Sequence, residues 1–280
     1  MLSPLVAAAG MTFSGSLEDY PDGIIIPVDK PWRWTSADVV RKVKFAAAKH
    51  FSYKKIKVGH AGTLDPLATG VLLVCIGKAT KLAEDLQKHE KEYVATVVFG
   101  ATTPSYDREK DPSGFFPVDG ITAASVEQAL EGLTGTYEQV APLFSAKSAD
   151  GVRAYEIARK LFRAGSGGLD ETALSLLTRN LVTVSEASLL EFAPLSAINV
   201  SRASGDESVA SSRINVADVS SLDLPAAIIR IRCSKGTYIR AFARDLGEAL
   251  GSGAFLADLR RTASGTFSAP VPFTEVLTML

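Results

Sequence analysis

The chain has 280 residues, of which 46% are hydrophobic and 22% are charged, and its formal net charge is −1. This length and composition are ordinary for a globular protein and allow a sizeable buried core. No uninterrupted apolar stretch approaches the roughly 20 residues that cross a bilayer, so we expect no membrane-spanning helix.

Hydrophobic periodicity and turn residues predict a mixture of strands and helices. In the first part of the chain we expect a strand over residues 23–28, a helix that begins at Thr35 or Ser36, a buried strand over 71–76 and a helix over 78–88. A strand over 92–100, a loop over 101–120 and a helix over 125–133 should follow. The last part should contain a hairpin turn at 150–151, a helix over 153–162, a strand over 228–233 and a helix over 237–250 that ends at Gly251. Strict βαβ alternation is missing. The pattern therefore predicts an α+β fold with a mixed, largely antiparallel sheet flanked by helices and loops.

The same pass along the chain predicts one principal domain over residues 23–270. Residues 1–22 form an N-terminal extension, which we expect to be loose from Met1 to Phe13, and residues 271–280 form a short C-terminal tail. Two segments have the composition of insertions. Residues 163–170 are rich in glycine, and residues 201–221 contain seven serines and few large apolar groups.

Charge is distributed unevenly along the chain. Residues 39–64 contain no acidic residue but seven basic ones, and a second basic run lies between residues 230 and 261. Such a face attracts phosphate groups, although a solvated helix surface explains the charge alone equally well. Cys75 and Cys233 lie inside apolar runs and form no metal-binding pair. We therefore expect reduced, buried thiols in a cytoplasmic chain without a signal peptide, metal or cofactor.

The most informative stretch runs from Gly59 to Gly70 and reads GHAGTLDPLATG. Its glycines permit tight turns, and Pro66 disfavours a helical conformation for Asp65. A basic stretch comes directly before it and would attract phosphates towards the Asp65 carboxylate. This layout suits chemistry on a nucleotide sugar, but an aspartate before a proline is also a common turn residue.

Residues 59–70 resemble the signature loop of the TruB family of tRNA pseudouridine synthases at every fixed position, G-H-x-G-T-L-D-P-x-A-x-G. Further blocks of the family occur in the same order. They are Asp29-Lys30-Pro31, Gly77-Lys78-Ala79-Thr80-Lys81, Lys91-Glu92-Tyr93, Ser145-Ala146-Lys147, the stretch from Cys233 to Arg240, and Leu259-Arg260-Arg261. The resemblance implies a pseudouridine synthase fold and a catalytic domain that converts a uridine in the T-loop of tRNA, position 55, to pseudouridine.

The resemblance also implies the catalytic residues. Asp65 matches the aspartate that attacks the target nucleoside, and a carboxylate suits a sugar that develops oxocarbenium character. Whether it bonds to the sugar or removes a proton stays open. Tyr93 matches a tyrosine that packs on the target base, and Arg240 matches the arginine that pairs with the aspartate and keeps it ionised.

Three further matches imply contacts with the substrate. Tyr238 would line the base pocket, and Leu259 would contact the flipped uracil. His60 would fill the space that the uridine leaves, which partly offsets the cost of base flipping. We assign no catalytic role to Lys30 or Lys81, which we expect to serve packing or phosphate contacts.

Two departures from the family stand out. The chain leaves no room for the C-terminal PUA domain of many relatives, so RNA binding would depend on the basic runs. Residues 101–107, ATTPSYD, differ from the commoner T-D-T-x-D form, a local variation that we expect to leave Asp65 unaffected.

The expected partner is the T-arm of tRNA, bound by a monomer that needs no other protein and no membrane. A guide-dependent, dyskerin-like RNA pseudouridine synthase is the nearest alternative. A non-catalytic RNA-binding or RNA-folding protein and, more remotely, a nucleotide-binding enzyme are others.

Overall fold

The computed structural model describes residues 2–142, 148–149, 152–153, 179–198, 200 and 214–280. It divides into two compact units. Unit 1 comprises Met1–Val94, Ser201–Ile214 and Asp258–Leu280, and unit 2 comprises Ala95–Val200 and Asn215–Ala257. The strands β5 (Lys91–Phe99) and β13 (Ala254–Ser264) contribute residues to both units.

Unit 1 is built around β4 (Ala68–Ile76), whose residues from Val71 to Ile76 are completely buried. One edge of β4 pairs with β2 (Ile24–Lys30) in antiparallel orientation. The other edge is shared. β3 (Val58–Ala61) pairs antiparallel with the second half of β4, and β13 pairs parallel with its first residues. The connection between β3 and β4, which carries Asp65, therefore begins and ends beside β13.

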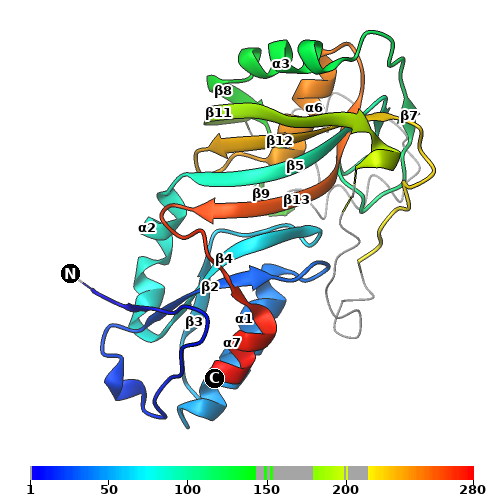
Figure 1. Ribbon diagram of the computed structural model, residues 1–280. Helices are drawn as coiled ribbons and strands as arrows, with labels where there is room; N and C mark the ends of the chain where they lie inside the picture. The colour runs from blue at the N-terminus through cyan, green and yellow to red at the C-terminus, as the bar shows by residue number, and fades with distance from the viewer. Residues whose placement is uncertain (1, 143–147, 150–151, 154–178, 199, 201–213) are drawn as a thin grey trace. The chain divides into compact units, whose positions relative to one another are not determined.

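Helix α1 (Ser36–His50) covers part of this sheet, and its start follows the sequence prediction. Thr35 is the N-cap, and it forms a capping box with Asp38 that satisfies backbone donors at the helix terminus. Val39, Val43 and Ala47 form its buried stripe. Helix α7 (Phe273–Met279) lies beside α1 (Figure 1), and the Phe273 ring packs edge-on against Trp34 with 5.0 Å between ring centroids. The 3-10 helix η2 (Gly77–Leu82) and α2 (Ala83–Lys88) follow β4.

The N-terminal end of the chain is more ordered than the sequence analysis expected, and the C-terminal tail is also structured. Leu5–Val6 form β1, which pairs in parallel with β2, and Ala7 and Phe13 are buried. The prediction of a loose segment from Met1 to Phe13 was therefore wrong. Beyond residue 270, β14 (Val271–Pro272) pairs with β2 before α7 begins. In both cases a few apolar side chains bury against a distant strand, which local composition does not reveal.

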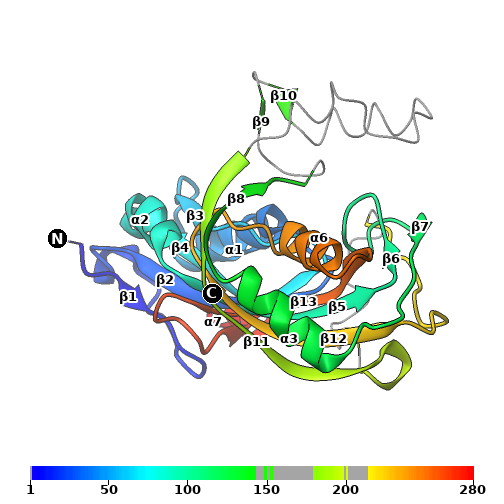
Figure 2. The ribbon, with the colours of Figure 1, turned by 90° about the horizontal axis from the view of Figure 1, so that it is seen from above.

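Unit 2 contains the antiparallel strands β8 (Gly135–Val140), β11 (Arg179–Pro194) and β12 (Pro225–Cys233), followed in the sheet by β5 and β13. Helices α3 (Ala123–Gly132) and α6 (Ile239–Ala249) pack against each other (Figure 2). Two short hairpins are formed by β6 (Ala101–Thr102) with β7 (Gly114–Phe115) and by β9 (Ser148–Ala149) with β10 (Val152–Arg153). The α+β fold with a mixed, largely antiparallel sheet is confirmed.

The second predicted insertion, residues 201–221, differs in part from expectation. Residues 201–213 lie outside the described residues, as do most of the predicted helix over 153–162 and the glycine-rich stretch 163–170. Beyond them, Ala217 and Val219 are buried in the core cluster that includes Val98, Leu195 and Phe255. The segment thus contributes to the core of unit 2 despite its serine content.

Within the part of the chain that the structure describes, no helix is long and apolar enough to cross a membrane. Cys75 and Cys233 are both buried, as predicted.

Candidate active site

The loop that carries Asp65 connects the end of β3 to the start of β4. Gly62 adopts a φ of 91°, a conformation that favours glycine, and the Ala68 amide donates a hydrogen bond of 3.1 Å to the Asp65 carbonyl. Leu259 on β13 lies opposite Ala68 in the parallel ladder. The turn therefore places Asp65 just before the start of β4, next to the strand that supplies Leu259.

Lys30, at the end of β2, fixes the backbone on one side of Asp65. Its side chain is buried, and its ammonium group donates hydrogen bonds to three carbonyls, those of Pro31, Trp34 and Pro66, at 2.9, 2.6 and 3.2 Å. Burial lowers the pKa of Lys30 from 10.5 to about 7, while the nearby Asp65 carboxylate acts in the opposite direction. Lys30 thus holds the backbone next to Asp65 and also interacts electrostatically with the Asp65 carboxylate.

Arg261, on β13, fixes the preceding part of the loop. The side chain is 1% exposed, and its guanidinium donates to the carbonyls of Gly62, Thr63 and Val71 at 3.1, 3.5 and 2.7 Å. The Arg261 backbone also lies against Gly70, where an added Cβ would clash with the Arg261 carbonyl oxygen. A larger residue at position 70 would therefore separate β4 from β13.

Ser36, the first residue of α1, completes the support of the loop. Its hydroxyl donates to the Leu64 carbonyl at 3.1 Å and accepts from the Leu64 amide at 2.9 Å. Leu64 itself is buried. The residues before and after Asp65 are thus held by three separate elements, which leaves the half-buried carboxylate on a fixed backbone.

Three other predicted site residues belong to unit 1. His60 lies on β3, and its Nδ1 is buried without a hydrogen-bond partner among the described residues. Burial and, secondarily, the charge of Arg261 lower the pKa of His60, so the ring is neutral at physiological pH. Tyr93 on β5 and Leu259 on β13 are each 8% exposed.

Two predicted site residues, Tyr238 and Arg240, belong to unit 2. Arg240 is buried in the first turn of α6. Its Nε lies 3.7 Å from the Asp107 carboxylate, and Nη1 donates to the Ser105 carbonyl at 3.1 Å. Asp107 in turn accepts hydrogen bonds from the Ser105 hydroxyl at 2.6 Å and the Glu109 amide at 2.9 Å. The guanidinium is therefore held by a carboxylate that is itself hydrogen-bonded.

Tyr238 immediately precedes α6 as its N-cap residue. Its amide donates to Oε1 of Gln139 at 2.8 Å, and its carbonyl accepts from Nε2 of the same side chain at 3.2 Å. Gln139 on β8 is completely buried. This pair of hydrogen bonds fixes the backbone from which the Tyr238 and Arg240 side chains project.

The structure thus places Asp65, His60, Tyr93 and Leu259 in one unit and Arg240 and Tyr238 in the other, and the pairing of Arg240 with Asp65 stays a prediction. The sequence analysis missed Asp107. It treated residues 101–107 as a local variation, yet this segment holds the predicted arginine. The available signal was only general, since a buried arginine requires an acidic partner somewhere in the fold.

In the described ranges, no cluster of three or more His, Cys, Asp or Glu side chains is positioned to hold a metal ion.

Comparison with known proteins shows the family of this chain. Residues 49–165 match the model of the TruB family pseudouridylate synthase N-terminal domain, and residues 240–280 match that of the tRNA pseudouridylate synthase B C-terminal domain. The tRNA pseudouridine synthase B of Phocaeicola vulgatus is 44% identical over 247 residues, which cover 88% of each chain. This chain belongs to the TruB family. The Bacteroides thetaiotaomicron member is 45% identical over 249 residues, again with 88% of each chain covered.

Solved structures extend the likeness of the fold. The Cbf5-Nop10-Gar1 complex contains a chain that is 24% identical, with a TM-score of 0.55, and an H/ACA RNP bound to a substrate RNA contains one that is 22% identical, with a TM-score of 0.53. The present chain is covered over 91% and 97% of its length, but it spans only 54% and 59% of theirs. The predicted pseudouridine synthase fold is confirmed.

Proposed function

We propose that this TruB-family member isomerises uridine 55 in the T-loop of tRNA to pseudouridine, with Asp65 as the catalytic carboxylate. The observation that carries the proposal is the fixed Asp65 loop. Lys30, Ser36 and Arg261 hold its backbone on both sides, Asp65 itself is half-buried, and the loop leads into Ala68, which lies opposite Leu259. Curated relatives at 42–45% identity, all named tRNA pseudouridine synthase B, support the reaction and the class of RNA.

The chemistry requires the bond between C1′ of the ribose and N1 of the uracil to break and a bond from C1′ to C5 to form. Positive charge develops on the sugar as the first bond breaks, and a nearby carboxylate stabilises that charge or bonds to the sugar directly. Asp65 suits both versions because its backbone does not need to reorganise. The detached uracil then turns, and C5 bonds to C1′, which releases the Asp65 oxygen from the sugar if the two had bonded. A base removes the C5 proton and N1 takes up a proton, so that the product is an isomer of the substrate.

The target base must leave the RNA stack before Asp65 can reach its sugar. We assign the vacated space to the neutral ring of His60 and one wall of the uracil pocket to Leu259. Tyr93 and Tyr238 would pack on the base, and Tyr93 would also assist proton transfer. Arg240 would hold the Asp65 carboxylate ionised through a charge-assisted hydrogen bond.

Asp107 extends this proposal as a residue that positions Arg240. The Asp107→Asn protein keeps an acceptor for Ser105 but loses the negative charge opposite Arg240, so we expect kcat to fall about 10- to 100-fold. Single-turnover assays would measure the chemical step, and thermal melting would show whether the fold is retained. A Glu109→Gln protein is the matched control, because Glu109 donates to Asp107 through its backbone amide, which this substitution keeps. An unchanged single-turnover rate for Asp107→Asn would contradict the positioning role.

The direct test of the function uses the purified chain alone and an unmodified tRNA transcript. Pseudouridine mapped only to position 55 is the expected result, and we expect it from a monomer acting in the cytoplasm. A requirement for a guide RNA and partner proteins would favour the dyskerin-like alternative. Tight binding without product would favour a non-catalytic RNA-binding protein.

A further inference from the structure

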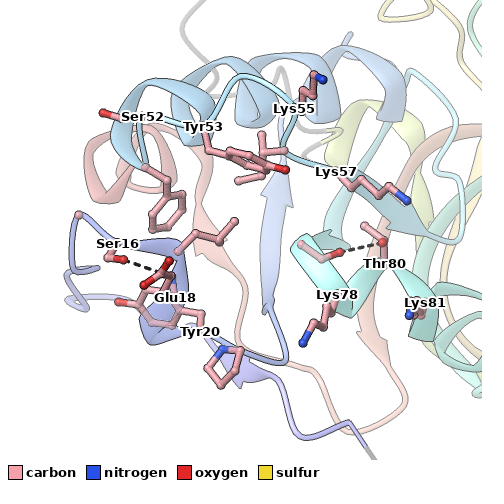
Figure 3. Close-up of a pocket in the computed structure, with 16 residues that line it drawn as sticks. Ser16, Glu18, Tyr20, Ser52, Tyr53, Lys55, Lys57, Lys78, Thr80 and Lys81 are labelled. Carbon is pink, nitrogen blue, oxygen red and sulfur yellow. Dashed lines mark hydrogen bonds between the residues drawn. The ribbon is translucent and has the colours of Figure 1, made fainter.

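A pocket of about 800 Å³ lies in unit 1, away from the Asp65 loop. It is bordered by the N-terminal segment 15–21, by residues between 51 and 57, which follow α1, and by η2. Figure 3 shows Lys57, Lys78 and Lys81 on one side of it and Ser16, Glu18 and Tyr20 on the other. A pocket of this size is large enough for a small organic ligand such as a nucleotide.

The walls of the pocket are anchored by the ordered N-terminal segment. Tyr20 packs edge-on against Phe51, with 5.9 Å between ring centroids, and its hydroxyl accepts a hydrogen bond of 2.7 Å from the Ser14 amide. On the opposite side, the Gly77 amide donates to the Lys57 carbonyl at 2.8 Å. The pocket is thus a feature of the folded backbone rather than a chance gap between exposed side chains.

Four lysines line the pocket, against a single carboxylate, Glu18. All four are exposed at the surface, and none has an ion-pair partner among the described residues. The lysines are Lys55, Lys57, Lys78 and Lys81. Their arrangement contrasts with Lys30 and Arg261, whose cationic groups bind backbone carbonyls. The pocket therefore presents positive charge that is available to an anionic ligand.

Tyr53 adds an aromatic surface to these charges. Its side chain is 49% exposed while it lines the pocket, so a face of the ring is accessible. Lysines beside an accessible aromatic ring are typical of sites for unpaired nucleotides, since the phosphate pairs with the ammonium groups and the base stacks. Glu18, across the pocket, can accept hydrogen bonds from base amino groups, and it would repel an acidic peptide.

The pocket also connects with the Asp65 site through β3. Lys57 precedes this strand and His60 lies within it, so only about 10 Å of extended chain separates the two. We propose that the pocket binds one unpaired nucleotide of the RNA substrate, with its phosphate on Lys57, Lys78 and Lys81 and its base on Tyr53. This inference rests on the proposed function, because it takes RNA as the substrate.

The test compares closely matched variants in tRNA binding and turnover. Lys81→Ala removes a pocket lysine, and Lys88→Ala removes an exposed lysine seven positions further on, outside the pocket. We expect Lys81→Ala to raise the Kd and KM for unmodified tRNA about fivefold and to reduce the slope of log K against log salt by about 0.7 to 0.9. Lys88→Ala should stay within twofold of the wild-type chain.

The aromatic contact has its own pair of variants. Tyr53→Ala should weaken tRNA binding about tenfold, and Tyr53→Phe should restore it, since stacking needs the ring and not the hydroxyl. The inference is overturned if both pocket variants bind tRNA like Lys88→Ala, or if all three lose affinity equally. It is also overturned if AMP or GMP binds in a Lys81-dependent manner while tRNA binding does not change, which would indicate a site for free nucleotides.

Wild-type turnover separates this inference from the proposed function. Pseudouridine formation by the wild-type chain together with unchanged binding by the pocket variants would reject the pocket alone. Absence of product from the wild-type chain would reject the proposed function.

Discussion

Two sets of cationic side chains in unit 1 have opposite roles. Lys30 and Arg261 are each 1% exposed and donate to backbone carbonyls around Asp65. The pocket lysines, by contrast, lie at the surface, and the described structure gives them no ion-pair partner. The comparison separates cations that shape a loop from cations that can bind a ligand. Their positions in the sequence do not distinguish the two sets, because both lie close to family motifs.

The largest effect should follow from removal of a buried cation. Arg261→Met deprives the carbonyls of Gly62, Thr63 and Val71 of their donor, and we expect the free energy of unfolding to fall by about 3–5 kcal/mol. Arg260→Met is the control. The Arg260 side chain is 43% exposed and pairs with Asp29, so its loss should cost at most about 1 kcal/mol. If chemical denaturation showed equal losses of stability for Arg261→Met and Arg260→Met, the distinction between buried and exposed cations would be wrong.

A smaller effect concerns how the free energy of unfolding depends on pH through Lys30. The pKa of Lys30 is about 7 in the folded chain and about 10.5 when exposed, so unfolding takes up a proton between these values. The contribution of Lys30 to stability should therefore rise with pH across this window, by roughly 2 kcal/mol between pH 7 and 9. Denaturation of the wild-type and Lys30→Met chains across this range would measure the difference in slope. Parallel curves would show that Lys30 keeps its proton on folding.

The smallest expected change in the free energy of unfolding concerns the exposed lysines of the pocket. Lys57→Ala and Lys81→Ala remove exposed side chains without ion pairs in the described part of the chain, so each should alter the free energy of unfolding by less than about 0.5 kcal/mol. The same denaturation assay applies. A loss comparable to that of Arg261→Met would mean that these lysines support the fold, as Lys30 and Arg261 do.

The sequence predicted the local elements of the fold well because their signals are local. The capping residue Thr35, the apolar stripe of α1 and the buried run in β4 are all visible in a short window. In β5 the alternating residues Tyr93, Ala95, Val97 and Phe99 are buried, but Thr96 and Val98 between them are buried as well. Alternation identifies one face of a strand and cannot report a second covering layer.

The errors share a physical cause. Phe13 and Val219 are single apolar residues in polar surroundings, and their burial depends on partners that are distant in the chain. The pairing of Asp107 with Arg240 joins two positions that are far apart in the sequence, which no local pattern indicates. At the candidate site, the family motif identified Asp65, whereas only the structure showed that Lys30 and Arg261 fix its loop.

The central claim is that the fixed Asp65 carboxylate performs the chemistry and is dispensable for holding the RNA. The most direct measurement compares tRNA binding and pseudouridine formation for Asp65→Asn, with Asp85→Asn, an exposed acid on α2, as the control. The account predicts that Asp65→Asn binds unmodified tRNA within about threefold of the wild-type chain and forms product at least roughly 1,000-fold more slowly. Asp85→Asn should retain full activity. Wild-type product formation by a correctly folded Asp65→Asn chain would contradict the account.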